Sequence, residues 1–164
     1  MIGAVIFDLD GTLIHLPVDY ERFFRELRKV MKTPNVRPLT KVIARSNAET
    51  RKKALEVWKK AEFAALPKMR VNNEGMNLYR RFSEKTKVLV TLQSRALALS
   101  ALERLELSFR VVITREDSLD RVMQLELAVH ELGLRSEDVL FIGDTENDSI
   151  SAEKVGCKFI KVRT

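Results

Sequence analysis

Residues 4–14, AVIFDLDGTLI, decide how the rest of the chain is organised. The run 4–7 is apolar, with β-branched residues and an aromatic, which is typical of a short buried strand. It stops at two carboxylates, Asp8 and Asp10, and a glycine and a hydroxyl follow directly. One interpretation is a tight hairpin turn at Asp10-Gly11, because glycine tolerates a positive φ. The other is that both aspartates share a small space at a strand end. There, one carboxyl keeps its proton while the other stays ionised or binds a cation.

Composition limits the chain to one main domain with at most a small appended module. Its 164 residues can bury about two-thirds of the unfolded surface, and the apolar content of 45% is ordinary for a globular protein. The net charge of +6 favours anionic ligands, phosphates included. Because the bases lie beside acids with no block of like charge, solvated helix faces are the better interpretation, and nucleic acid is not expected as a partner.

The single cysteine, Cys157, excludes a disulfide framework. It follows a glycine and precedes an apolar run, which predicts a buried, structural thiol. The sequence shows no secretory signal and no apolar run of membrane length. We therefore expect a cytoplasmic protein without a membrane partner, and the oligomeric state stays open.

Hydrophobic periodicity predicts a regular alternation of strands and helices in the second half of the chain. The predicted strands cover residues 4–7, 87–91, 111–114, 139–142 and 159–162. The predicted helices cover residues 20–31, 39–45, 49–66, 73–85, 95–106, 122–132 and 149–155. Asp19 is the expected N-cap of the first helix. The residues expected to form packing stripes are Leu55, Trp58 and Phe63 in the third helix and Leu99, Leu102 and Leu105 in the fifth.

This alternation predicts an α/β fold: a Rossmann-like parallel five-stranded sheet with helices on both faces. Residues 16–70 contain no comparable strand. They predict a small all-helical cap inserted after the first strand, so that residues 1–15 and 71–164 form the α/β core.

Polar residues follow three of the predicted strands. Asp8 and Asp10 follow the first, Thr91 closes the second, and GDTEND, residues 143–148, follows the fourth. Because the carboxyl ends of parallel strands meet along one edge, these groups are expected to converge there. A set of carboxylates without a Cys/His group favours Mg²⁺ over Zn²⁺. Of the two histidines, His130 is expected on a helix surface, and His15 is the better placed to face the site.

In these two acidic motifs, DLDGTL at residues 8–13 and GDTEND at residues 143–148, the chain resembles the haloacid-dehalogenase-like hydrolase superfamily. The resemblance spans nearly the whole chain and is greatest to the phosphoglycolate-phosphatase-like branch, which has a helical cap after motif one. It implies that Asp8 is a nucleophile forming an aspartyl phosphate, and that Asp10 protonates the leaving oxygen and then activates water. It also implies that Thr91 binds the transferring phosphate.

The same resemblance implies a Mg²⁺ site made by Asp8, the main-chain carbonyl of Asp10 and Asp144, with Asp148 in support. Two departures stand out. Leu92 occupies the position after the motif-two threonine where the family often has asparagine, and the motif-three Lys-Pro is absent. Arg121 is the expected replacement for that lysine as a phosphate-binding group, and Arg115 is the second choice.

The resulting hypothesis is a Mg²⁺-dependent phosphatase of small phosphorylated metabolites, with phosphoglycolate as a candidate through the resemblance only. Dehalogenases and phosphonatases of the superfamily characteristically lack the second acid, here Asp10, which favours phosphate-ester chemistry. Two alternatives stay open at this point: a phosphomutase using the same aspartyl phosphate, and a non-catalytic binding or regulatory protein on this fold.

Overall fold

The computed structural model describes residues 1–164, and contacts between residues divide the chain into two compact units. The α/β unit contains Met1–His15 and Arg70–Thr164, and the helical unit contains Leu16–Met69. That the helical unit acts as a cap stays a prediction. No helix is both long enough and apolar enough to cross a membrane.

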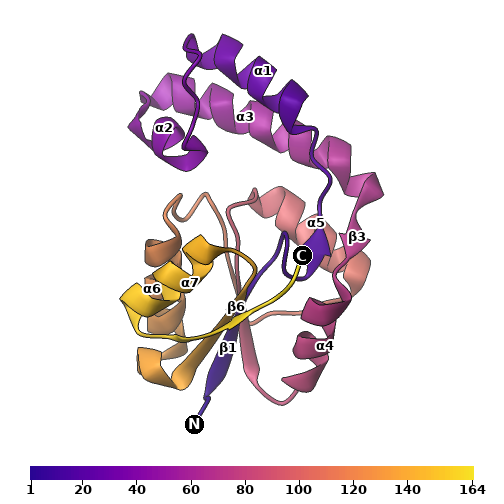
Figure 1. Ribbon diagram of the computed structural model, residues 1–164, viewed down its shortest axis with the longest axis vertical. Coiled ribbons are helices and arrows are strands. Elements are labelled where there is room, and N and C mark those ends of the chain that lie inside the picture. Colours follow the sequence, from indigo (N-terminus) through magenta and orange to yellow (C-terminus); the bar gives the residue numbers. More distant parts are fainter. The chain divides into compact units, whose positions relative to one another are not determined.

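The α/β unit is built on one five-stranded parallel sheet, as predicted, in the order β5-β4-β1-β6-β7. The strands are β1 (Ala4–Asp8), β4 (Thr86–Val90), β5 (Val111–Ile113), β6 (Val139–Gly143) and β7 (Lys158–Lys161). The helices of this unit are α4 (Asn73–Arg81), α5 (Arg95–Leu105), α6 (Arg121–Leu132) and α7 (Glu146–Val155). In Figure 1, α4 and α5 cover one face of the sheet, and α6 and α7 cover the other.

The central strand β1 is buried along its whole length, because it is paired on both sides and covered on both faces. Successive residues point to opposite faces. Ile6 belongs to the apolar cluster under α6 and α7, which includes Leu125 and Phe141. Phe7 contacts the rings of Tyr79 and Phe109 at centroid distances of 5.9 and 6.1 Å.

The hairpin interpretation of Asp10-Gly11 is wrong. β1 is parallel to both of its neighbours, β4 and β6. The following residues form a separate short strand, β2 (Ile14–His15), which pairs antiparallel with β3 (Arg70–Val71). These two-residue strands were not predicted, because two residues are too few to show a periodicity.

The helical unit consists of α1 (Tyr20–Met31), α2 (Leu39–Arg45), α3 (Ala48–Ala65) and a short 3₁₀ turn (Leu66–Lys68). Asp19 caps α1 as predicted, since its side chain accepts a hydrogen bond from the Arg22 amide at 3.1 Å. Phe23 of α1 stacks on Trp58 of α3 with their ring centroids 6.0 Å apart.

Two of the predicted packing stripes differ from the observed ones. In α3 the buried residues are Ala54, Trp58, Glu62 and Ala65, whereas Phe63 is 37% exposed. In α5 the buried residues are Leu97, Ala98, Ala101 and Leu102, whereas Leu99 is 48% exposed. In both helices small alanines form part of the packed face, so selecting only the large apolar residues gave the wrong stripe.

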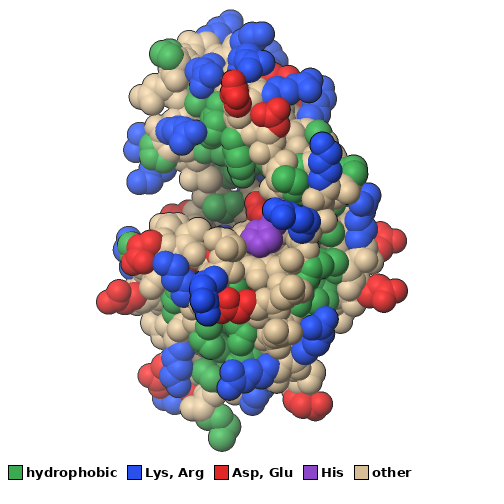
Figure 2. Space-filling view, turned by 45° about the vertical axis from the view of Figure 1, so that its right-hand side comes forward, with side chains coloured by type: hydrophobic (Ala, Val, Ile, Leu, Met, Phe, Trp, Pro, Cys, Tyr) green, Lys and Arg blue, Asp and Glu red, His purple; other side chains and the backbone are tan.

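The positive charge is concentrated in the helical unit. Its 54 residues hold 14 Lys and Arg against 6 Asp and Glu, a net charge of +8, whereas the α/β unit holds 15 against 17, a net charge of −2. Figure 2 shows that acidic side chains lie among the basic ones over much of the visible face. The net positive charge of the chain therefore comes from residues outside the α/β unit that carries the acidic motifs.

Cys157 follows α7 and is 9% exposed, as predicted for a structural thiol. Burial raises its pKa to about 11. The folded protein therefore keeps this thiol protonated, and its contribution to stability is full below the unfolded-state pKa of about 8.5 and is lost as the pH rises towards 11.

We expect Cys157 to react slowly with a thiol reagent at pH 8, because the thiolate is the reactive form and the sulfur is buried. Unfolding in urea should restore the rate of an ordinary thiol, which a colorimetric thiol assay measures. Equal rates in folded and unfolded protein would contradict the burial of this side chain.

Candidate active site

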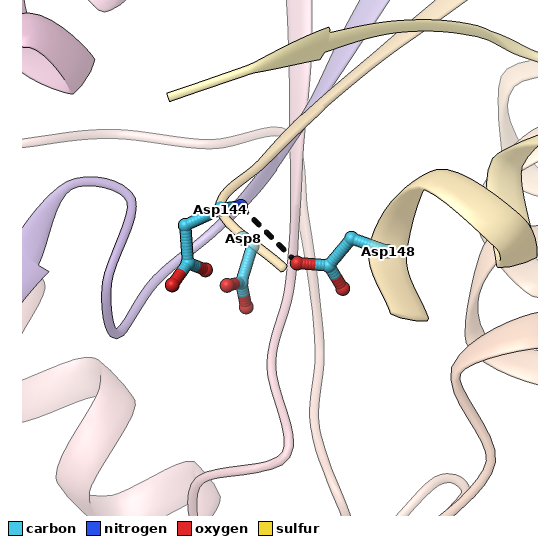
Figure 3. A group of neighbouring side chains, drawn as sticks. All are labelled: Asp8, Asp144 and Asp148. Carbon is cyan, nitrogen blue, oxygen red and sulfur yellow. Dashed lines mark hydrogen bonds between the residues drawn. The ribbon is translucent and has the colours of Figure 1, made fainter. Parts of the chain in front are cut away.

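Three carboxylates meet at the carboxyl edge of the sheet, on the α/β unit alone. Asp8 ends β1, Asp144 follows β6, and Asp148 lies in the first turn of α7. One oxygen from each lies within 4.8 Å of the others, and Figure 3 shows the three side chains side by side. Asp8 and Asp148 are buried, with 5% and 2% exposure, and Asp144 is partly exposed. β1 and β6 are the two strands between which the chain reverses its winding direction, where ligands bind in open α/β sheets.

Asp148 is positioned by the start of α7. This helix begins at Glu146, three residues earlier than predicted, with Thr145 as the N-cap in a reciprocal capping box with Asp148. Asp148 is thus the third residue of the helix, and Thr145 is its N-cap. Its Oδ2 accepts hydrogen bonds from the amides of Asp144 and Thr145, both at 3.2 Å. A Cβ on Gly143 would lie 2.7 Å from this oxygen, which explains the glycine.

The turn after β1 brings a hydroxyl between two of the carboxylates. Gly11 has φ +88°, and a Cβ there would lie 2.1 Å from Asp144 Oδ2, so the turn requires glycine on both counts. The Thr12 hydroxyl lies 3.2 Å from Asp8 Oδ2 and 3.2 Å from Asp144 Oδ1. Thr12 was not among the predicted site residues, although its place in the first motif could have indicated it.

Arg121, the first residue of α6, is the cation that faces this cluster. Its Nη2 donates to Asp8 Oδ1 at 2.9 Å and its Nε donates to Asp148 Oδ1 at 3.0 Å. The side chain is 7% exposed. Its remaining nitrogen, Nη1, donates to Gln124 Oε1 at 2.7 Å.

Gln124 fixes the position of this arginine. Its Nε2 donates to the main-chain carbonyls of Thr91 and Ser118, at 2.8 and 3.0 Å, so that Oε1 is turned towards Arg121. Gln124 was not predicted, although its spacing of three residues from Arg121 on one helix was the available signal. Arg115 lies elsewhere: it is buried, and its Nη1 donates to the Leu92 carbonyl at 3.3 Å.

The cluster holds three acidic side chains and only one basic side chain, that of Arg121. Burial is the largest influence on Asp8 and raises its pKa well above the usual range. Arg121 lowers that pKa, while Asp148 and Asp144 raise it. Burial also raises the pKa of Asp144, opposed by hydrogen bonds from its neighbours. One guanidinium therefore faces three carboxylates in a poorly hydrated space.

Thr91 and Asp10 lie in the same region without joining the carboxylate cluster. Thr91 directly follows β4 and is buried, and its hydroxyl accepts a hydrogen bond from the Gln93 amide at 3.1 Å. The side chain of Asp10 is turned to Gln93, whose Nε2 donates to Asp10 Oδ2 at 3.4 Å. His15 is partly buried in β2, and His130 is exposed on α6 as predicted. Neither histidine belongs to the cluster.

Comparison with known proteins assigns this chain to a family. The model of the haloacid dehalogenase-like hydrolase family matches residues 5–162, so this chain belongs to that family. No curated protein matches the chain.

Solved structures show the same fold at low sequence identity. A candidate phosphoglycolate phosphatase from Lactobacillus plantarum is 20% identical with a TM-score of 0.73, over 97% of this chain and 86% of that one. A predicted phosphatase from Clostridium acetobutylicum is 20% identical with a TM-score of 0.71, over 98% and 84%. The protein CbbY from Rhodobacter sphaeroides, in complex with phosphate, is 14% identical with a TM-score of 0.71, over 100% and 87%.

Proposed function

We propose that this chain is a Mg²⁺-dependent phosphatase of small phosphomonoesters that forms an aspartyl phosphate on Asp8. One observation carries the proposal: a buried carboxylate at a strand end is oriented by an arginine through one oxygen, and the other oxygen faces a second carboxylate. The names of the two phosphatase-like structures and the phosphate held by CbbY support the same class of substrate.

The donor set fits a hard divalent cation. The cluster consists only of aspartate oxygens, and Mg²⁺ prefers such ligands. Asp8, Asp144 and the main-chain carbonyl of Asp10 would hold the ion, with Asp148 in support. When bound, Mg²⁺ would neutralise charge on the phosphate oxygens and supply the positive charge that this cluster lacks.

The chain's own residues account for both halves of the reaction. Asp8 attacks phosphorus through Oδ2, the oxygen that Arg121 leaves free, and the bond from phosphorus to the ester oxygen breaks. Asp10 gives its proton to that leaving oxygen. It then takes a proton from water, which attacks phosphorus and releases Asp8 and inorganic phosphate.

Arg121 and Thr91 are proposed to bind the transferring phosphoryl group. The guanidinium can hydrogen-bond the phosphoryl oxygens while it holds Asp8 and Asp148 in place. Leu92 stands where the family often has asparagine, and its side chain has no hydrogen-bond donor. We therefore expect the phosphate contacts at this position to come from main-chain amides.

A test of the metal site uses the melting temperature, independently of activity. Mg²⁺ should raise the Tm of metal-free protein, because it binds only the folded cluster. Asp144→Asn should raise the Tm of the metal-free protein by a few degrees, since it removes one of three repelling charges, and should abolish most of the Mg²⁺ shift.

The Mg²⁺ shift should be larger at pH 8 than at pH 5, because the ligands bind in their deprotonated form and the pKa values of Asp8 and Asp144 are raised. Glu84→Gln, an exposed acid on the same unit, is the matched control and should leave both values unchanged. An undiminished Mg²⁺ shift in Asp144→Asn would remove Asp144 from the metal site.

The function itself is tested by phosphate release. Purified protein with Mg²⁺ and a panel of small phosphomonoesters should liberate inorganic phosphate, and EDTA should stop the release. Isomerised sugar phosphate without free phosphate would instead identify a phosphomutase. The absence of turnover across the panel would contradict a phosphatase.

A further inference from the structure

One buried polar atom beside the proposed acid has no partner. Gln93 is 8% exposed, and its Oε1 is the only buried side-chain nitrogen or oxygen without a hydrogen bond. Leaving such an acceptor unsatisfied destabilises a protein, so native proteins rarely do so without a reason. The residue also stands in the segment where the sequence departs from the family pattern, one position after Leu92.

Both the main chain and the carboxamide nitrogen of Gln93 are hydrogen-bonded. Its amide nitrogen donates to the Thr91 hydroxyl at 3.1 Å, and its carbonyl accepts from the Arg115 amide at 3.4 Å. Its side-chain Nε2 donates to Asp10 Oδ2 at 3.4 Å. Nε2 donates to Oδ2, and the proton that Asp10 gives to the leaving group is carried by its other oxygen, so Oε1 is left as an acceptor next to Asp10.

Because Gln93 Oε1 lies beside Asp10, it also lies close to where the leaving group of the substrate would bind. If Asp10 protonates the leaving oxygen, that oxygen must lie within hydrogen-bonding distance of the Asp10 carboxyl. The organic part of the substrate then passes beside the Gln93 carboxamide. A phosphate dianion offers no donor at neutral pH, whereas a hydroxyl of the organic part can donate to Oε1.

We propose that Gln93 positions Asp10 through Nε2 and selects, through Oε1, phosphomonoesters whose alcohol carries a further hydroxyl close to the ester oxygen. This inference rests on the proposed function and names its substrate class. It disfavours phosphoglycolate, because the carboxylate of that compound brings another acceptor to Oε1. A site with an unpaired polar group rejects the analogue that cannot pair with it.

Three small esters of similar size test the selection directly. They are 2-hydroxyethyl phosphate, propyl phosphate, in which a methyl replaces the hydroxyl, and phosphoglycolate. Wild-type protein should hydrolyse 2-hydroxyethyl phosphate with a kcat/KM about tenfold to a hundredfold above that of the other two. Equal kcat/KM for the hydroxyl and methyl esters would overturn the proposal without any variant having to fold.

The variant Gln93→Met keeps the length of the side chain and removes both hydrogen-bonding groups. The preference for the hydroxyl ester over propyl phosphate should fall to about one. The variant also no longer positions Asp10. Therefore kcat for both alkyl esters should fall more than kcat for p-nitrophenyl phosphate, whose leaving group departs without a proton. Asn77→Met, the same change at an exposed amide of α4, should alter neither ratio.

The outcomes separate this inference from the proposed function. Normal Mg²⁺-dependent turnover of p-nitrophenyl phosphate without a hydroxyl preference would overturn the selection by Gln93 and leave the phosphatase intact. No turnover of any ester would overturn the phosphatase and this inference together. A preference that persists undiminished in a folded Gln93→Met, verified by its melting curve, would assign the selection to another residue.

Discussion

Asp8→Asn is expected to reduce kcat for every phosphomonoester by about 10⁴-fold or more, because the substitution removes the proposed nucleophile. The variant should fold, since the amide keeps the shape of the side chain and removes one of three repelling charges from a buried cluster. Phosphate release under saturating Mg²⁺ measures the effect, and a melting curve verifies the fold.

The matched control is Asp19→Asn, which makes the same change at an exposed helix N-cap where asparagine serves equally well. It should retain full turnover. If Asp8→Asn retained turnover within tenfold of wild type, Asp8 would not be the nucleophile.

Arg121→Met should cause the largest loss of stability of any single change at the site. It leaves the buried carboxylates of Asp8 and Asp148 without their cation, and breaking a buried ion pair from one side costs about 3–5 kcal/mol. For a chain of this size the Tm of metal-free protein should fall by on the order of 10 °C. The loss should shrink towards pH 5, because the pKa of Asp8 is raised and its protonated carboxyl needs no cation. Turnover should also fall, since the phosphoryl group loses its guanidinium donors.

Arg95→Met is the matched control, because Arg95 pairs with Asp117 at a similar distance of 2.8 Å while both side chains are about 40% exposed. Exposed pairs contribute about 1 kcal/mol or less, so its Tm should change little. Arg121→Lys should recover only part of the stability, since a single ammonium nitrogen cannot take the three positions from which Nε, Nη1 and Nη2 donate to Asp148, Gln124 and Asp8. Equal melting of Arg121→Met and Arg95→Met would contradict the burial of the Arg121 cluster.

The sheet could be predicted from the sequence because each strand is a short apolar run bounded by turn residues. The buried run that ends at Asp8 and the run before Gly143 carry strong local signals, and a parallel sheet needs no further information to bring their ends together. Boundaries were less accurate where a cap decides them. α7 begins three residues early because Thr145 and Asp148 form a capping box, which depends on the local backbone as well as on composition.

The polar contacts around the cluster could be predicted only in part. Arg121 was a candidate as the replacement for the motif-three lysine that the resemblance implies, but its two ion pairs depend on how α6 packs on the sheet. Gln93 contacts Asp10 across 83 residues of sequence, where no local pattern indicates the pair. Gln124 contacts Arg121 along one helix turn, where their spacing of three residues is the only signal. Such contacts depend on tertiary packing, which the secondary-structure propensities of the residues do not determine.

The central claim, a covalent phosphoryl group on Asp8, is tested most directly by trapping it. Asp10→Asn with p-nitrophenyl phosphate and Mg²⁺ should accumulate the intermediate, because the nitrophenolate leaves without a proton while hydrolysis then lacks its base. After rapid acid quench and digestion, mass spectrometry should find one phosphoryl group on the peptide that contains Asp8, and none in Asp8→Asn. A protein that turns over this ester while its Asp8 peptide stays unmodified at every quench time would contradict the account.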